Sequence, residues 1–387
     1  MPLEPEPRPD WAHRLREARR ARGWDVARLA RELRRAGGRD ASATAQSLVR
    51  MIRDWEKGTY RPRERYRLLL ARLLEVDLDH QEGAPAPGLL ELPGSGRAEE
   101  VATAVRATSA HIVALDARFG ARDLVEVAVR AAAQAHRTAQ ARFNTDREVL
   151  AAAAEAQQIA GWVAFDAERQ DLSRRMSLEA LLSARSAGDR SMEQFVLGQL
   201  AMQDAHLHRP VEAAQICSAA LEEGAKGSVR TMFTLRAARA AAQMGEHARA
   251  RDLIEATHSS YLDGPRDRDP AWAWWLSQAE ICWHHAMIHA DIGQWTQAVE
   301  LFAAACRPSA GYAWAASIYR ASLLWALAHA QAWDEAETVL VRDVLPHQGE
   351  VASVRTERTL ARAARLLDGA SGRPSLRESA RQLTAAP

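Results

Sequence analysis

Residues 45–62 read AQSLVRMIRDWEKGTYRP, and this stretch decides how the rest of the chain is interpreted. Its large apolar residues recur with the period of a helix and form one face: Leu48, Met51, Ile52 and Trp55. The opposite face carries Arg50, Arg53 and Asp54, while Gly58 followed by Pro62 is typical of a helix end. A short helix with one apolar face and one arginine-rich face suits the major groove of DNA.

The residues on either side of this stretch predict three more short helices. Two precede it, over residues 11–22 and 25–36, and one follows it, over residues 63–76. An aspartate stands where each of the first two would begin and can cap it: Asp10 and Asp25. Four to five short helices around one small core match a helix-turn-helix domain, which we place at residues 9–78.

The same residues carry a resemblance to a family. RLREARRARGWDVARLARELRR, followed by SLVRMIRDWEKGTYRP, resembles the DNA-binding domain of the XRE (Cro/CI-type) transcriptional regulators. The residues that match the family pattern in order are Gly23, Trp24, Leu29, Ala30, Ile52, Trp55, Glu56, Gly58 and Pro62. Two departures concern the docking register: Val26 stands where the family often has a phosphate-binding glutamine, and the connection over residues 36–44 is long. The resemblance covers about residues 11–76 and implies a homodimer on double-stranded DNA.

The resemblance also implies which side chains contact DNA. Those expected to face the bases from the third helix are Gln46, Ser47, Val49, Arg50, Arg53 and Asp54. Those expected to bind the phosphate backbone are Lys57, Arg61 and Arg22. Arginine suits base recognition because its planar fork matches the O6 and N7 acceptors of guanine. The alternative is that the arginines of this helix only solvate an exposed face.

Charge is distributed unevenly along the 387 residues. Residues 1–75 contain 19 Lys and Arg and 11 Asp and Glu, a net charge of +8. The remaining residues contain 32 and 39 and have a net charge of −7. A basic N-terminal module on an acidic remainder favours a polyanionic partner for the module alone. Nearly all the basic residues are arginine, which fits a high-GC genome of the actinobacterial type.

Residues 79–100 are rich in proline and glycine and are expected to form a linker. From there to residue 387 the sequence is alanine-rich and predicts helical hairpins. A small residue recurs at the same place in four similar breaks: Ala213, Ala250, Ala298 and Ala336. This resembles a tetratricopeptide array, which implies a solenoid of five or six helix pairs serving as a sensor or dimerisation domain. An insertion at residues 258–270 is expected to be an exposed loop.

Eight of the twelve tryptophans lie between Trp272 and Trp333. Several aromatic residues exceed what two helices need and could line a pocket for a small molecule or a peptide: Trp272, Trp274, Trp275, Tyr312 and Trp314. The alternative is that these rings form the solenoid core or a dimer interface.

Catalytic chemistry finds little support in the sequence. There is no phosphate-binding loop, nucleophile elbow or metalloprotease motif, so we expect no enzyme and no cofactor. His285 and His289 could share a metal, but two polar residues on a repeat helix beside Trp283 explain them better, and we assign no metal site. Without a signal sequence or an apolar span, we expect a cytoplasmic, nucleoid-associated protein with no membrane partner. The leading interpretation is a DNA-binding regulator, and the alternatives are a solenoid adaptor with weak DNA docking or an enzyme around the two histidines.

Overall fold

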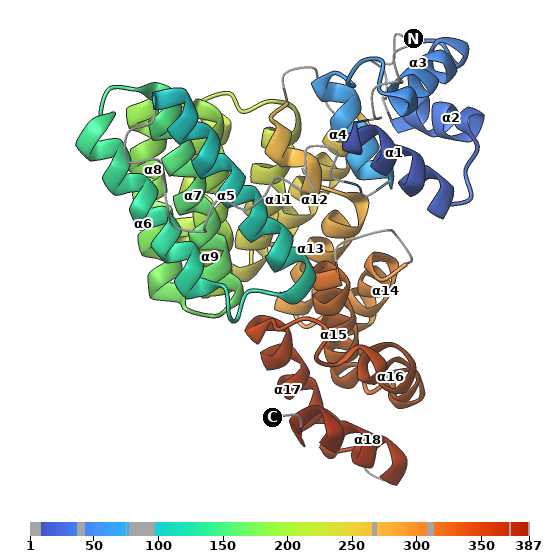
Figure 1. Cartoon of the computed structure of the whole chain (residues 1–387). Helices are drawn as coiled ribbons and strands as arrows, with labels where there is room; N and C mark the ends of the chain where they lie inside the picture. Colours follow the sequence, from blue (N-terminus) through green and yellow to red (C-terminus); the bar gives the residue numbers. More distant parts are fainter. Residues whose placement is uncertain are drawn as a thin grey trace.

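The computed structural model describes residues 9–36, 43–74, 76, 97–264, 269–307, 313–370 and 373–385. Every regular element in this part of the chain is a helix, which confirms the predicted all-α class. Four short helices form the N-terminal module at one side of the molecule (Figure 1): α1 (Asp10–Ala21), α2 (Val26–Ala36), α3 (Ala45–Lys57) and α4 (Glu64–Leu74). Most of the predicted linker lies outside the described residues, and the next helix begins at Ala98.

The N-terminal module has its own core, built from the apolar faces that the sequence predicts. Its most buried side chains come from all four helices: Leu15, Leu29, Leu33, Leu48, Ile52, Trp55, Leu69, Leu70 and Leu74. The Asp25 carboxylate caps α2 by accepting a hydrogen bond from the Arg28 amide at 2.6 Å. The other predicted cap is wrong, because α1 already includes Asp10 and has Pro9 as its N-cap.

The rest of the described chain forms seven helical hairpins, where the sequence predicts five or six. Their helices are α5 (Ala98–Phe119) and α6 (Val125–Arg142), α7 (Arg147–Asp166) and α8 (Gln170–Ala187), α9 (Arg190–His206) and α10 (Pro210–Glu222), α11 (Gly227–Gln243) and α12 (His247–Leu262), α13 (Gln278–Asp291) and α14 (Trp295–Ala305), α15 (Ala313–His329) and α16 (Trp333–Val339), and α17 (Val354–Asp368) and α18 (Pro374–Ala385). Helix α16 continues into two short turns, η3 (Leu340–Val344) and η4 (Leu345–His347). None of the described helices is long and apolar enough to span a membrane.

Each repeated alanine is the fourth residue of the second helix of its hairpin. Ala213, Ala250, Ala298 and Ala336 are all buried, which confirms the tetratricopeptide-like spacing. The same position in α6 and α8 holds Ala128 and Ser173, and both are buried. The Ser173 hydroxyl donates to the Gly161 carbonyl of α7 at 2.8 Å, so this serine satisfies its own polar group. A small side chain is needed there because the two helices of a hairpin approach closely.

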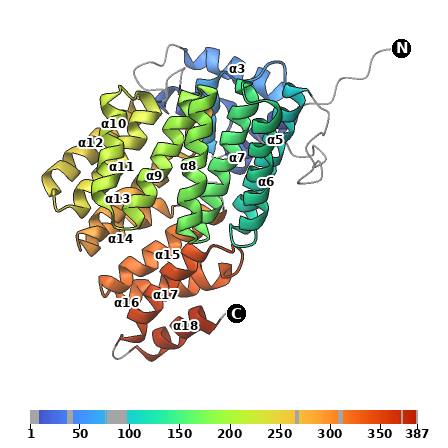
Figure 2. The same cartoon turned by 90° about the vertical axis from the view of Figure 1, so that its left-hand side faces the viewer.

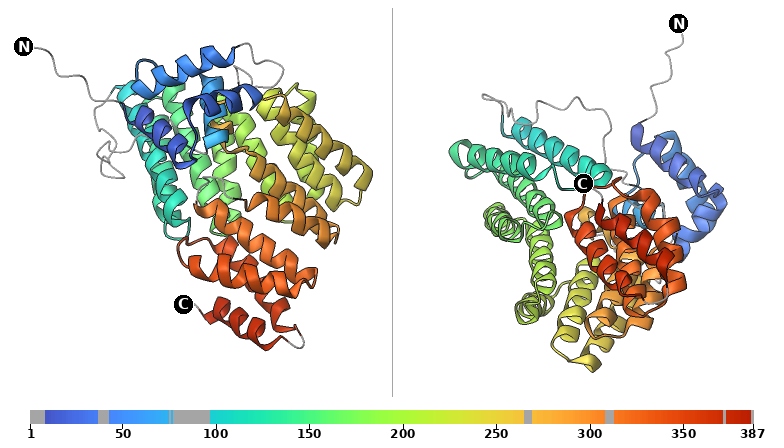
Figure 3. Two further views of the ribbon diagram at one scale, coloured as in Figure 1. Left: turned by 90° about the vertical axis from the view of Figure 1, so that its right-hand side faces the viewer. Right: turned by 90° about the horizontal axis from the view of Figure 1, so that it is seen from below.

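The hairpins follow a superhelical path that brings the C-terminal helices back beside α5 (Figures 2 and 3). Two backbone hydrogen bonds join segments far apart in the sequence: the Ala352 amide donates to the Phe119 carbonyl at 2.7 Å, and the Arg122 amide donates to the Ala352 carbonyl at 3.1 Å. Gly120 lies between them with a φ of 84°, and a Cβ there would lie 2.7 Å from the Ala352 carbonyl carbon. Only glycine fits this contact.

We call this contact of the end of α5 with the segment before α17 the closure. Charged side chains of α17 reinforce it. The Arg355 guanidinium is buried and pairs with the Asp166 carboxylate at 3.0 Å. Its carbon centre lies 5.8 Å from the Trp162 ring and 5.3 Å from the Phe165 ring. A second buried carboxylate, Asp116 of α5, accepts a hydrogen bond from Trp162 Nε1 at 3.1 Å. Burial, aided by the charge of Asp166, raises the pKa of Asp116 to about 7.

The insertion at residues 258–270 is not an exposed loop throughout. Helix α12 extends through its first five residues, and residues 265–268 lie outside the described part of the chain. Asp269 is buried, and its carboxylate accepts from the Ser228 amide at 3.0 Å and from the Ser228 hydroxyl at 2.7 Å. The insertion therefore folds back over the start of α11. There the Asp269 carboxylate pairs with a backbone amide that the N-terminus of a helix would otherwise leave without a partner.

Candidate nucleic-acid interface

Helix α3 begins and ends as the sequence predicts. At its start the Thr44 hydroxyl accepts a hydrogen bond from the Ser47 amide at 3.1 Å. At its end Gly58 adopts a left-handed conformation with a φ of 83°, and its amide donates back to the Trp55 carbonyl. These caps fix the ends of the helix and its length, so the side chains between them have a defined register.

A buried ion pair holds α3 against α1. Arg19 Nε donates to Glu56 Oε1 at 2.5 Å and Arg19 Nη2 donates to Glu56 Oε2 at 2.9 Å. The third guanidinium nitrogen, Nη1, donates to the Trp24 carbonyl at 2.7 Å, in the turn between α1 and α2. Both charged side chains are only about a tenth exposed. One arginine therefore fixes the orientation of α3 and of the turn that precedes α2.

The outward face of α3 is cationic and polar. Gln46, Arg50, Arg53 and Lys57 are exposed, while Leu48, Ile52 and Trp55 of the same helix are buried. The helix lies on the outer side of the N-terminal module, away from the hairpins (Figure 1). This arrangement leaves the outward face open to a long, rod-like partner.

Four of the other predicted DNA contacts lie in less open positions, and Arg61 is the exception. Val49 and Ser47 are half-buried, and the Ser47 hydroxyl accepts from the Thr44 hydroxyl at 3.0 Å. The half-buried carboxylate of Asp54 accepts a hydrogen bond from the Tyr60 hydroxyl at 2.7 Å, which occupies one of its oxygens. Arg22 is half-buried with its guanidinium 5.8 Å from the Trp24 ring, whereas Arg61 is exposed. The exposed residues, Arg61 among them, are therefore better placed to meet DNA than the four half-buried ones.

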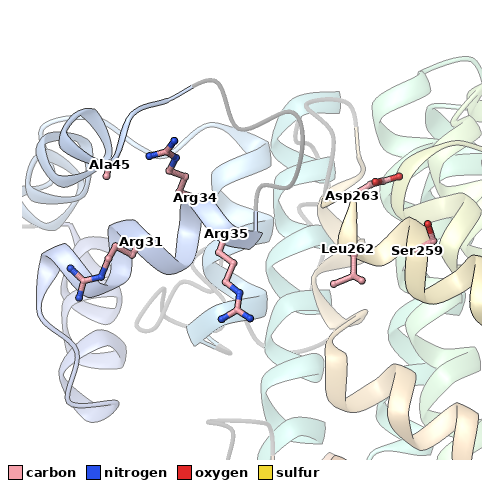
Figure 4. A pocket seen from close by; sticks show the side chains of 7 residues that line it. All are labelled: Arg31, Arg34, Arg35, Ala45, Ser259, Leu262 and Asp263. Carbon is pink, nitrogen blue, oxygen red and sulfur yellow. The ribbon is translucent and has the colours of Figure 1, made fainter.

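Basic residues that the sequence reasoning missed lie on α2. Arg31, Arg34 and Arg35 line an open cleft of about 700 Å³ between α2 and the end of α12 (Figure 4). The opposite wall consists of Ser259, Leu262 and Asp263. The three arginines are exposed and follow the spacing of one helix face, a pattern visible in the sequence RELRRA. Their place against α12 is not visible there, since it depends on how the module docks.

The tryptophan cluster forms part of that docking. Trp272, Trp274 and Trp275 belong to a 3-10 helix, η2 (Ala271–Trp275), which contacts α4 of the N-terminal module. Trp272 stacks on Phe195 of α9 with ring centroids 4.5 Å apart, and its Nε1 donates to the Ser191 hydroxyl. These contacts favour the structural alternative, in which the rings pack the solenoid and its junction with the module.

Two further aromatic residues belong to the predicted pocket. Tyr312 lies outside the described residues, and Trp314 lies in α15 without a described side chain. Trp275 faces the buried guanidinium of Arg236, whose carbon centre lies 5.7 Å from the ring. Burial lowers the pKa of Arg236 to about 10. The predicted ligand pocket stays a prediction.

Groups that could perform chemistry are few. Burial raises the pKa of the Cys217 thiol and of the Cys306 thiol to about 12, so neither is a nucleophile at neutral pH. Among the described residues, no three or more His, Cys, Asp and Glu side chains converge on one metal position. His285 and His289 do lie together, and a third imidazole, His258 of α12, joins them.

Comparisons with known proteins assign no family. No protein-family model matches the sequence, and no curated protein matches it. A crystal structure of a Rap protein complexed with competence and sporulation factor is similar over 97% of this chain and 95% of that chain, with 13% identity and a TM-score of 0.48. A likeness this distant establishes neither a shared ligand nor a shared function.

Proposed function

We propose that this helical-repeat protein is a sequence-specific DNA-binding regulator. The N-terminal module would place α3 in the major groove, and the solenoid would mediate dimerisation and the sensing of a small molecule or peptide. A dimer is needed because one module of this size covers too little DNA for strong specificity.

The observation that carries this proposal is the outward face of α3. A helix that exposes Gln46, Arg50, Arg53 and Lys57 from a rigid, capped frame presents base-recognising forks and a phosphate-binding ammonium together. The resemblance of residues 11–76 to XRE domains supports the same orientation. Contact of η2 with α4 offers a route by which changes in the solenoid would reach the module.

The proposal is tested by selecting bound genomic fragments at about 0.15 M salt, where loose phosphate binding is weakened. We expect a short enriched motif. Replacing Arg50 and Arg53 together with Ala should abolish the enrichment, since each base-reading arginine contributes about 1–3 kcal/mol of discrimination. Wild-type protein that enriches no motif would contradict the proposal.

The matched control removes the same charge elsewhere. Arg130 and Arg137 are exposed on α6, far along the chain from the module. Their double replacement with Ala changes the net charge equally and should leave the enriched motif intact. If both double variants lose binding to the same extent, then binding depends on overall charge and α3 does not read sequence.

A second candidate function is a protein-interaction adaptor. The outer helix α8 exposes Leu178 and Leu182 one turn apart, with exposed fractions of 45% and 65%. Apolar side chains in such a stripe suit a protein surface better than DNA. Affinity capture that yields a stoichiometric protein partner, lost on Leu182→Glu, together with no DNA motif, would favour the adaptor over the regulator.

A further inference from the structure

Three imidazoles meet where α12 packs against α13. His258 Nε2 lies 3.4 Å from His285 Nδ1, and His285 Nε2 lies 3.3 Å from His289 Nε2. The three side chains are all half-buried, so each keeps part of its surface in contact with solvent. Among the described residues none of the three is paired with a carboxylate, whereas the neighbouring His284 lies 3.2 Å from Glu280.

The contact of His289 with Gln294 fixes which nitrogen of His289 carries a lone pair. His289 Nδ1 lies 2.7 Å from Gln294 Oε1, and a carbonyl oxygen only accepts, so Nδ1 carries the proton and Nε2 the lone pair. The backbone amide of Gln294 in turn donates to the backbone carbonyl of His289 at 2.8 Å, which holds the glutamine in place. His285 has two ways to complete the chain. It donates from Nε2 to the His289 lone pair when no ion is bound, and when it donates from Nδ1 to His258 Nε2 instead, its own Nε2 lone pair faces that of His289.

In this second tautomer the two Nε2 lone pairs converge and can bind one cation. A tetrahedral metal ion with bonds of about 2.05 Å to nitrogen separates two such ligands by about 3.3 Å, and this matches the observed distance between the two Nε2 atoms. Hydrogen bonds from the far ring nitrogens to fixed acceptors are the usual support of metal-binding histidines. Spacing of i and i+4 on one helix is also a known zinc-binding arrangement.

We propose that His285 and His289 chelate one divalent transition-metal ion of the zinc, nickel and copper class. His258 and Gln294 hold the two rings in the ligating orientation, and water completes the coordination. The class follows from imidazole ligands, which suit these metals better than magnesium or calcium.

The third imidazole does not become a ligand in this arrangement, because it faces the far side of the His285 ring. The cluster is therefore a two-histidine chelate, in agreement with the absence of a three-ligand group among the described residues. The inference does not depend on DNA binding, because it rests on α12, α13 and the turn that follows them.

The test is calorimetric titration of the full, tag-free chain with Zn²⁺, Ni²⁺ and Cu²⁺ at neutral pH. We expect one ion per chain and, with Cu²⁺, a paramagnetic resonance spectrum that shows coupling to two nitrogens. His289→Gln should remove this binding. His258→Gln should weaken it about 10- to 100-fold, the range typical of residues that orient a ligand.

His247→Gln is the matched control, because His247 is exposed at the start of α12 and outside the cluster. It should bind the metal as the wild type does. Circular dichroism establishes that each variant is folded before titration. Absence of stoichiometric binding to the wild type would overturn the proposal, as would binding that persists after both His285 and His289 are replaced with Gln.

Discussion

Glu56→Ala is expected to open the N-terminal module while the solenoid stays folded. The substitution leaves the Arg19 guanidinium buried without the carboxylate that accepts two of its hydrogen bonds. Removing one partner of a buried ion pair costs about 3–5 kcal/mol, because the remaining charge is desolvated and unpaired. That cost is comparable with the whole stability of a small domain.

This prediction is tested by measuring hydrogen-exchange rates of individual backbone amides. The amides of α3 should exchange at least about a hundredfold faster in Glu56→Ala, since each 1.4 kcal/mol corresponds to a factor of about ten. Amides in α7 and α11 should exchange as in the wild type. The matched control is Glu17→Ala, because Glu17 lies 3.6 Å from Arg20 in an exposed pair on α1. Such a pair contributes about 1 kcal/mol or less. Equal protection of α3 in both variants would show that the buried pair does not hold the helix.

Local signals in the sequence predict the N-terminal module well. Helix periods, the Asp25 cap and the Gly58 end all depend on residues within one or two turns of each other, and the structure confirms them. The repeated alanines are equally local, because each reports the close approach inside a single hairpin. Seven hairpins exceed the predicted number because positions such as Ser173 break the alanine pattern while still accommodating close packing.

Contacts between distant segments could not be predicted. The sequence predicts that Asp269 lies in an exposed loop, but it is buried because the insertion folds back over α11. Trp272 looks like a pocket residue, and its partner Phe195 lies on a helix much earlier in the chain. Nothing near His285 in the sequence indicates His258. For the candidate interface, the exposed arginines of α3 follow from periodicity, whereas the hydrogen bond from Tyr60 that occupies Asp54 does not.

The closure between α5 and α17 leads to a prediction about pH. Asp116 is only 5% exposed and shares its surroundings with Asp166, Arg355 and Trp162, and its pKa is raised from 3.8 to about 7. The folded chain therefore retains a proton that the unfolded chain releases near pH 4. Stability contributed by this group falls as pH rises from about 4 to about 7, and above pH 7 the folded state bears the full cost of the buried charge.

Asp116→Asn should stabilise the protein at pH 8, because it removes that charge and keeps a carbonyl oxygen to accept from Trp162 Nε1. Three pKa units correspond to at most about 4 kcal/mol, so we expect a higher unfolding midpoint at pH 8 and almost no difference at pH 4. Measuring both chains across this range isolates Asp116, since the histidines contribute equally to each. Asp123→Asn, an exposed control near the same closure, should follow the wild type at every pH.

A constant difference in stability between Asp116→Asn and the wild type would mean that Asp116 is ionised throughout this pH range. In that case Arg355 would compensate two buried carboxylates, and the closure would be held together by charge rather than by a neutral acid.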